Sequence, residues 1–384
     1  MRRIYMDYAA TTPVDDRVLK TMLPYFSELY GNASEIHSFG LEAKRALEES
    51  RAKVAHILNS DPSQIIFTSG ATESNNLALK GIAFADEKKG RHIMISSIEH
   101  HCVLDTAKWL ETRGFDITLL PVDKYGLVDP IAVEEAIRDD TLLVSVMHSN
   151  NEIGVLEPIA EIGEVCREKG VYFHSDAVQS LGKVPVDVEE LGVDLLSVSS
   201  HKLYGPKGVG ALYISEGVRL EPLAHGGGHE SGIRSGTENV AGIVGFGEAC
   251  RIAEEEMPKE SPRLTMLRDK LVSRILEVRD TCLNGHATKR LPNNANFSFK
   301  YIEGEALLLR LDDKGVAAST GSACSSKSAE PSHVLLALGL KPEDARGSLR
   351  LTLGRWTTGD EVDYVLEVLP PIVEELRSLS PLAR

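Results

Sequence analysis

The segment DLLSVSSHKLYGPKGVGALYIS, residues 194–215, places a lysine between two short apolar runs. Each run, DLLSVSS (194–200) and VGALYIS (209–215), has the length and composition of a buried β-strand. Lys202 follows the first run after a single residue, His201, so we expect it at the carboxyl end of a strand, where open α/β sheets bind their ligands. Taken alone, a lysine in this place could also be a solvated surface charge.

Apolar runs of the same kind recur on the amino-terminal side of this segment. They include IIFTS (65–69), HIMIS (92–96), TLLVSVMHS (141–149) and VYFHSDA (171–177), and helical stretches separate them. Alternation of strands with helices is typical of a mostly parallel sheet covered by helices on both faces. The sequence therefore predicts an α/β fold.

The length of 384 residues exceeds the usual size of a single hydrophobic core. We expect a large domain over residues 15–255. A long helical pattern over roughly 240–280 leads into a region with fewer strand–helix alternations. That region, residues 256–384, is expected to form a smaller α+β domain together with residues 1–14.

The composition argues against several classes of protein. A formal net charge of −15 does not suit a nucleic-acid partner, because phosphate contacts need clustered Lys and Arg. No apolar run approaches the roughly 18 residues of a membrane span. The N-terminal MRRIYMDYAATTP meets an acid and a proline too early to hold the apolar core of a signal peptide. We therefore expect a cytoplasmic protein.

The five cysteines are widely scattered, which is unlike a disulfide framework. The sequence has no CxxC pair and no HExxH helix, and three glycines separate His225 from His229, so no metal site is expected. Four thiols are expected to be buried in apolar surroundings, those of Cys102, Cys166, Cys250 and Cys282.

The segment FTSGATES (67–74) reads as a strand, a tight glycine turn and the start of a helix. Gly70, Ala71 and Thr72 would expose backbone N–H groups at a positive helix N-terminus, which favours a phosphate. An ordinary helix cap would give the same pattern.

Three more polar side chains are expected at strand ends. Asp176 and Gln179 lie in YFHSDAVQS, and His100 lies in SSIEHHCVLD. None is decisive alone, since His100 could simply cap a helix. The combination of a lysine, an acid and a phosphate cradle in one crevice is what pyridoxal phosphate requires. The lysine forms a Schiff base, the carboxylate keeps the pyridine nitrogen protonated, and the cradle holds the phosphate.

Cys324 differs from the other cysteines because it lies in STGSACSSKSAEPSH (319–333), a run of small residues. Such a run is typical of an exposed loop, whereas free cysteines are usually buried. An incidental loop thiol and a mobile nucleophile are both compatible with this placement.

Eight motifs in order resemble cysteine desulfurases of the NifS/IscS-like type, within the class V aminotransferase group of fold-type I pyridoxal-phosphate enzymes. The resemblance covers nearly the whole chain, from about Tyr5 to the TLGRWTT segment. The motifs are YMDYAATTP, FTSGATESNN, EHHCVLDT, MHSNNEIG, HSDAVQS, SSHKLYGPKG, GIRSGTEN and TGSACSS.

The resemblance implies roles around the cofactor. Lys202 would carry pyridoxal phosphate as a Schiff base and later move protons at the substrate Cα. Asp176 would pair with the pyridine nitrogen, and Gln179 would hydrogen-bond the ring oxygen. His100 would stack on the ring and assist proton transfer.

Further residues would hold the phosphate and the substrate. Asn151, which also belongs to the cofactor-binding set, and Arg350 would bind the substrate carboxylate, for which an Arg fork is suited. The phosphate would be held by Ala71, Thr72, Ser199 and His201, and by Thr237, which would reach across a homodimer interface into the partner's site.

Cys324 would attack the sulfur of L-cysteine, and the products would be alanine and a persulfide on Cys324. The persulfide would pass its sulfur to an acceptor such as an iron–sulfur scaffold protein, and Cys324 could also be a transient iron–sulfur ligand. The sequence ends in SPLAR, whereas some relatives carry a C-terminal extension that helps dock the scaffold, so the mode of docking is left open.

Three other functions remain alternatives. A class V aminotransferase would use the same Lys202 and Asp176 without needing Cys324. Selenocysteine lyase activity is a variant of the desulfurase. A non-enzymatic partner-binding subunit could dispense with the Schiff-base lysine, which this chain retains.

Overall fold

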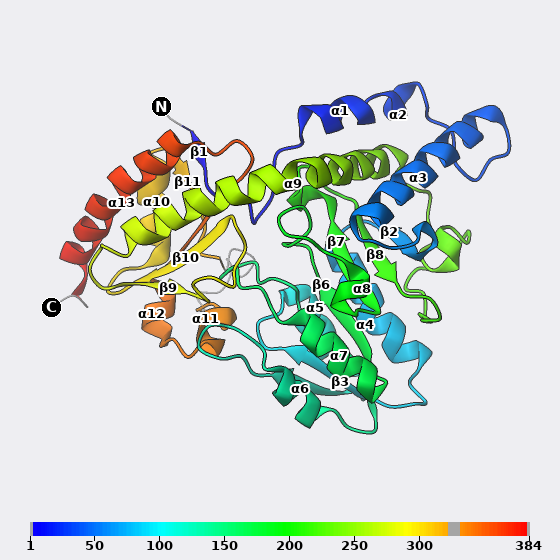
Figure 1. The fold of residues 1–384 in the computed structure, drawn as a ribbon, viewed down its shortest axis with the longest axis horizontal. Helices are drawn as coiled ribbons and strands as arrows, with labels where there is room; N and C mark the ends of the chain where they lie inside the picture. The colour runs from blue at the N-terminus through cyan, green and yellow to red at the C-terminus, as the bar shows by residue number, and fades with distance from the viewer. Residues whose placement is uncertain (1–2, 322–330, 382–384) are drawn as a thin grey trace.

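The computed structural model describes residues 3–321 and 331–381. Its larger part is built on a seven-stranded sheet in the order β2-β8-β7-β6-β5-β3-β4 (Figure 1). The strands are β2 (Ile65–Thr68), β3 (His92–Ser96), β4 (Asp116–Leu120), β5 (Thr141–Ser145), β6 (Tyr172–Asp176), β7 (Leu195–Ser199) and β8 (Gly210–Ile214). From β4 to β7 all neighbours are parallel, whereas β8 is antiparallel to both β7 and β2. The mostly parallel sheet predicted from the sequence is confirmed.

Both faces of this sheet are covered, as expected for strands that are apolar throughout. Successive residues of a strand point to opposite faces. Ile65 and Phe67 accordingly belong to one hydrophobic cluster, and Ile66 to another. The first cluster includes residues of α3 (Ser38–Ile57), α6 (Pro130–Ala136), α7 (Ile159–Lys169) and α8 (Val188–Leu191), and the second includes residues of α4 (Ala71–Ala85) and α5 (His101–Glu111).

The smaller part of the chain has its own hydrophobic core, separate from the two clusters on the large sheet. This core surrounds a three-stranded antiparallel sheet in the order β12-β10-β9. Strand β1 (Ile4–Tyr5) from the start of the chain pairs in parallel with β11 (Val316–Ala317) and joins this core. The other elements of this part are β9 (Thr281–Asn284), β10 (Asn294–Phe299), β12 (Ser348–Thr352), α10 (Gly304–Asp313), α11 (His333–Ala337), α12 (Pro342–Arg346) and α13 (Gly359–Leu379).

Helix α9 (Val240–Ile275) connects the two cores (Figure 1). Its first half packs with α1 (Asp16–Met22), α2 (Pro24–Ser27) and α3, and its second half packs with β10 and α13. The predicted domain boundary between residues 255 and 256 falls inside this continuous helix, and the division into two domains stays a prediction.

Three short 3-10 helices complete the described elements, η1 (Pro62–Gln64), η2 (Ser200–Lys202) and η3 (Glu230–Gly232). Within the described ranges, no helix is long and apolar enough to cross a membrane.

The buried-thiol prediction holds for Cys166 and Cys250, while Cys102 is partly buried. It is wrong for Cys282, which is exposed. Cys282 lies on β9, the edge strand of the small sheet, and its neighbours Thr281 and Leu283 are only half-buried, so the apolar letters of TCLNG do not mark a core strand.

Candidate active site

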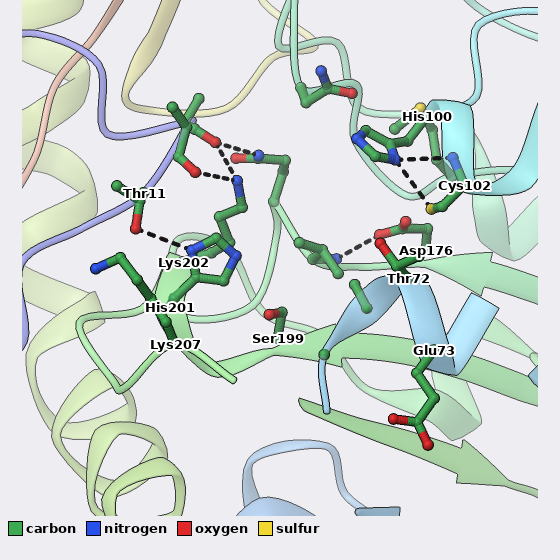
Figure 2. Close-up of a pocket in the computed structure, with 18 of the residues that line it drawn as sticks. Thr11, Thr72, Glu73, His100, Cys102, Asp176, Ser199, His201, Lys202 and Lys207 are labelled. Carbon is green, nitrogen blue, oxygen red and sulfur yellow. Dashed lines mark hydrogen bonds between the residues drawn. The ribbon is translucent and has the colours of Figure 1, made fainter. Parts of the chain in front are cut away.

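A cavity of about 560 Å³ lies at the carboxyl ends of β6 and β7, a volume typical of small-molecule sites (Figure 2). Most of the residues predicted for cofactor and substrate line this cavity. They are Ala71, Thr72, His100, Asn151, Asp176, Gln179, Ser199, His201, Lys202 and Arg350.

Two predicted residues are not among the lining residues. Thr237 lies at a separate hollow of about 300 Å³, beside Tyr30 and Asn239. Cys324 lies outside the residues that the structure describes.

Lys202 ends the 3-10 turn η2, which follows β7 directly. Its Nζ donates hydrogen bonds to the carbonyl oxygens of Ala9 (2.6 Å) and Ala10 (2.7 Å). The backbone N–H of Thr12 donates to the His201 carbonyl at 3.1 Å, so the N-terminal segment is fastened along the lysine turn. This segment forms part of the cavity wall.

Asp176 is the last residue of β6 and is only 5% exposed. Its Oδ1 accepts a hydrogen bond from the Val178 N–H (3.0 Å), and its Oδ2 accepts one from Nδ2 of Asn75 (2.6 Å). Both carboxylate oxygens are therefore fixed. Asn75 was missed by the sequence reasoning, although a fully buried asparagine on the apolar face of a helix would have been a signal.

His100 caps helix α5, and its Nδ1 accepts a hydrogen bond from the backbone N–H of Cys102 at 3.2 Å. Burial lowers the pKa of His100, and the positive charge of Lys202 lowers it further, while Asp176 opposes the shift. Figure 2 shows His100 and Cys102 on one side of the cavity and Lys202 with His201 on the other.

The N-terminus of α4 forms the predicted anion cradle. Gly70 precedes the helix with a φ of 148°, and as the N-cap residue it has no side chain with which to cap the first turn. Gly210 lies close beneath, since a Cβ on it would lie 2.8 Å from the Gly70 Cα. Ser199 and His201, at the end of β7, line the same region (Figure 2). Burial lowers the pKa of His201 to about 4, with Lys202 and Lys207 contributing.

Arg350 reaches the cavity from β12 of the small sheet. It is 3% exposed, its Nη1 donates to the Asn151 carbonyl (2.8 Å), and its Nη2 donates to Oδ1 of Asp7 (2.7 Å). Its Nε is buried and has no partner among the described residues. A buried guanidinium with N–H groups left uncommitted suits a carboxylate.

Lys183 lies behind the cavity and was also missed. Its Nζ donates to the carbonyl oxygens of Gln179 (2.8 Å) and Lys202 (3.4 Å). Burial lowers the pKa of Lys183 to about 7, with Lys202 adding to the shift. No cluster of three or more metal-ligating side chains occurs in the part of the chain that the structure describes.

The sequence matches that of a known family. The model of the aminotransferase class-V family matches residues 4–365. A cysteine desulfurase of Archaeoglobus fulgidus, IscS 1, is 54% identical over 380 residues, which cover 99% of each chain. This chain belongs to the class-V aminotransferase family and, within it, to the cysteine desulfurases.

Solved structures of the family have the same fold. A NifS-like protein superposes with a TM-score of 0.92 at 41% identity, covering 97% of this chain and 100% of the other. The structure titled "SspA in complex with cysteine" superposes with a TM-score of 0.83 at 40% identity, covering 92% of this chain and 100% of that one. The fold of this class-V family member is therefore the fold-type I architecture expected from its sequence motifs.

Proposed function

We propose that this chain converts L-cysteine to L-alanine and receives the released sulfur as a persulfide on Cys324. The persulfide then supplies sulfur to an acceptor for iron–sulfur cluster or other sulfur-requiring biosynthesis. The observation that carries the proposal is the convergence of Lys202, Asp176 and Arg350 on one cavity in a chain that belongs to the cysteine desulfurases.

The residues present fit pyridoxal phosphate. The uncapped first turn of α4 offers backbone N–H groups to a phosphate, and Ser199 and His201 add polar side chains beside it. Asp176 would hold a proton on the ring nitrogen, and Gln179 would donate to the ring oxygen. Lys202 would hold the cofactor through its amine. When bound, this cofactor supplies an electron sink for breaking bonds at the substrate Cα and Cβ.

The side chains that line the cavity bind the substrate carboxylate and transfer protons. Arg350 and Asn151 bind the substrate carboxylate, and the contact of Arg350 with Asp7 keeps the guanidinium in a fixed orientation. Lys202 moves the proton at the substrate Cα, because its amine is the basic group at the end of β7. His100 lies across the cavity from Lys202 and assists the second proton transfer.

The sulfur step balances without an added oxidant. The Cys324 thiolate attacks the substrate sulfur, the Cβ–S bond breaks, and an S–S bond forms. The carbon is reduced to the methyl group of alanine with protons from the site, and the transferred sulfur is left at the persulfide oxidation level. An acceptor thiolate then takes this sulfur and restores Cys324.

The deciding experiment incubates the purified holoenzyme with L-cysteine and measures alanine, sulfide and the mass of the Cys324 peptide. We expect alanine and a peptide heavier by one sulfur atom. Cys324→Ala should abolish the persulfide and alanine turnover together. An aminotransferase would instead keep its turnover in Cys324→Ala, and a binding subunit would lack the absorbance of bound cofactor. The same assay with L-selenocysteine in place of L-cysteine would identify a selenocysteine lyase by faster alanine formation from selenocysteine.

We also propose a homodimer in which Thr237 contacts the phosphate in the partner's cavity. Support comes from the position of Thr237 outside its own cavity and from the apolar side chains exposed on the same side of the chain. Phe26 and Tyr30, which line the same hollow as Thr237, are 64% and 66% exposed. Apolar exposure of this extent is typical of an interaction surface.

The scattered free thiols support a cytoplasmic location.

A further inference from the structure

His100 and Cys102 contact each other through two hydrogen bonds that end on the same ring nitrogen (Figure 2). The backbone N–H of Cys102 donates to Nδ1 of His100 at 3.2 Å, and the Cys102 Sγ lies 3.0 Å from the same atom. An Nδ1 that accepts from a backbone N–H carries no proton of its own. The thiol must therefore be the donor in the second contact.

Asn75 extends this contact to Asp176. Its Nδ2 lies 3.1 Å from the Cys102 Sγ and 2.6 Å from Oδ2 of Asp176. A side-chain amide nitrogen has two hydrogens, so it can donate to both acceptors at once. The result is a continuous chain of hydrogen bonds from the Asp176 carboxylate through Asn75 and Cys102 to His100.

The environment keeps the thiol in the state that this chain requires. Burial raises the pKa of Cys102 to about 12, and the negative charge of Asp176 adds to the shift. A thiolate would lose the donor and would place a second negative charge beside Asp176. Cys102 thus serves as a neutral S–H donor, in contrast to the nucleophilic role proposed for Cys324.

We propose that Cys102 is a positioning residue that fixes His100 as a neutral ring with its proton on Nε2 and, through Asn75, ties that ring to Asp176. With Nδ1 occupied by Cys102, Nε2–H is the group that His100 can offer as a hydrogen-bond donor to a bound molecule. The same chain of bonds fixes the orientation of the ring relative to Asp176. The inference rests on the proposed function for its catalytic consequence only, because the tautomer is a property of the resting protein.

The test measures the tautomer directly in the full-length holoenzyme labelled with ¹⁵N-histidine. Solid-state ¹⁵N NMR distinguishes a protonated from an unprotonated ring nitrogen, and the signal lost in His100→Gln identifies His100. We expect an unprotonated Nδ1 in the wild type. Cys102→Ala keeps the backbone N–H but removes the second donor to Nδ1, so it should weaken the preference for the unprotonated Nδ1 and raise the share of the other tautomer. Cys102→Ser should restore the wild-type pattern because it retains a side-chain donor.

A second experiment measures steady-state kinetics of Cys102→Ala and uses substitution of another cysteine, Cys166, as its control. Cys102→Ala should lower kcat for alanine formation about 3- to 10-fold, the range expected for the net loss of one hydrogen bond, with KM within about twofold. Cys166→Ala removes a buried thiol that is not among the residues lining the cavity, and it should leave both the His100 signals and kcat unchanged.

A protonated Nδ1 in the wild type, or an unchanged tautomer in Cys102→Ala, would overturn the inference. Thermal unfolding of each variant separates misfolding from a change in the ring. Where the alanine variant does not fold, Cys102→Val tests the inference, because it fills the space of the thiol without supplying a donor. If the wild type forms no alanine yet shows the expected tautomer, the proposed function fails while this inference stands.

Discussion

Nη2 of Arg350 donates a hydrogen bond to Oδ1 of Asp7 over 2.7 Å, joining residues that lie 343 positions apart in the chain. The guanidinium side chain is 4% exposed and the carboxylate side chain 19% exposed. A second N–H of Arg350 is held by the Asn151 carbonyl. The fork is thus oriented before any substrate arrives, which lowers the cost of ordering it on binding.

Arg350→Lys should weaken the binding of L-cysteine. A lysine keeps the charge but loses the planar fork, so it cannot contact Asp7, Asn151 and a substrate carboxylate together. We expect KM for L-cysteine to rise about tenfold or more, as loss of a hydrogen bond to a charged group implies. Steady-state alanine formation measures it. Arg274→Lys, at an exposed ion pair, should leave KM unchanged, and an unchanged KM in Arg350→Lys would contradict the assigned role.

Gly210→Ala should damage the anion cradle. The new Cβ would lie 2.6 Å from the Val198 carbonyl oxygen and 2.8 Å from the Gly70 Cα, both backbone atoms that cannot move aside cheaply. We expect a loss of about 1–3 kcal/mol in the free energy of unfolding, typical of overpacking, and a clear rise in the Kd for pyridoxal phosphate. Cofactor titration followed by absorbance checks this. Gly359→Ala adds a Cβ that meets nothing within 4 Å and serves as the control.

Glu157→Gln should change how stability depends on pH. Burial raises the pKa of Glu157 to about 8 from an ordinary value of 4.5. Between these values the folded state binds one proton more than the unfolded state, so the wild type loses stability as pH rises. Relative to Glu157→Gln, its free energy of unfolding should fall by at most about 1.4 kcal/mol per pH unit in this window and level off above it.

Denaturant unfolding from pH 5 to 9 would measure this difference, with Glu161→Gln as the exposed control. A wild-type-minus-variant difference that does not vary with pH would show that Glu157 ionises in the folded protein as it does in the unfolded chain.

Glu230→Gln should destabilise the glycine-rich segment between residues 219 and 239. Glu230 accepts hydrogen bonds from both Nη atoms of Arg51 at 2.8 Å, and its Oε2 also accepts from the Phe67 N–H at 2.7 Å. The Glu230 side chain is 3% exposed, so the substitution leaves a largely buried guanidinium without its counter-charge. We expect a loss of about 3 kcal/mol, measured by chemical denaturation. Glu221→Gln, more than half exposed, should have little effect.

The strands and the residues at their ends could be predicted because each depends on a local pattern. Lys202 and Asp176 lie at the carboxyl ends of short apolar runs, and parallel strands bring such positions to one edge. The partners of these residues could not be predicted in the same way. Asn75 lies 101 residues from Asp176, and nothing in either segment encodes their contact.

The local sequence pattern also does not predict whether a strand lies at the edge of a sheet, and therefore how far its side chains are exposed. Cys282 has apolar neighbours in sequence, but its strand lies at an edge and leaves the thiol exposed. The contact of Thr237 with a partner chain stays a prediction, as does the nucleophilic role of Cys324, which lies outside the described residues.

The hydrogen bonds from Lys202 to Ala9 and Ala10 join residues that are synthesised at different times, so this contact can form only after Lys202 has been added to the chain. The N-terminal segment leaves the ribosome first. Lys202 follows its partner Ala9 by 193 residues, and Arg350 follows its partner Asp7 by 343 residues. Because Arg350 is one of the lining residues, the cavity lining is complete only after residue 350 has been synthesised.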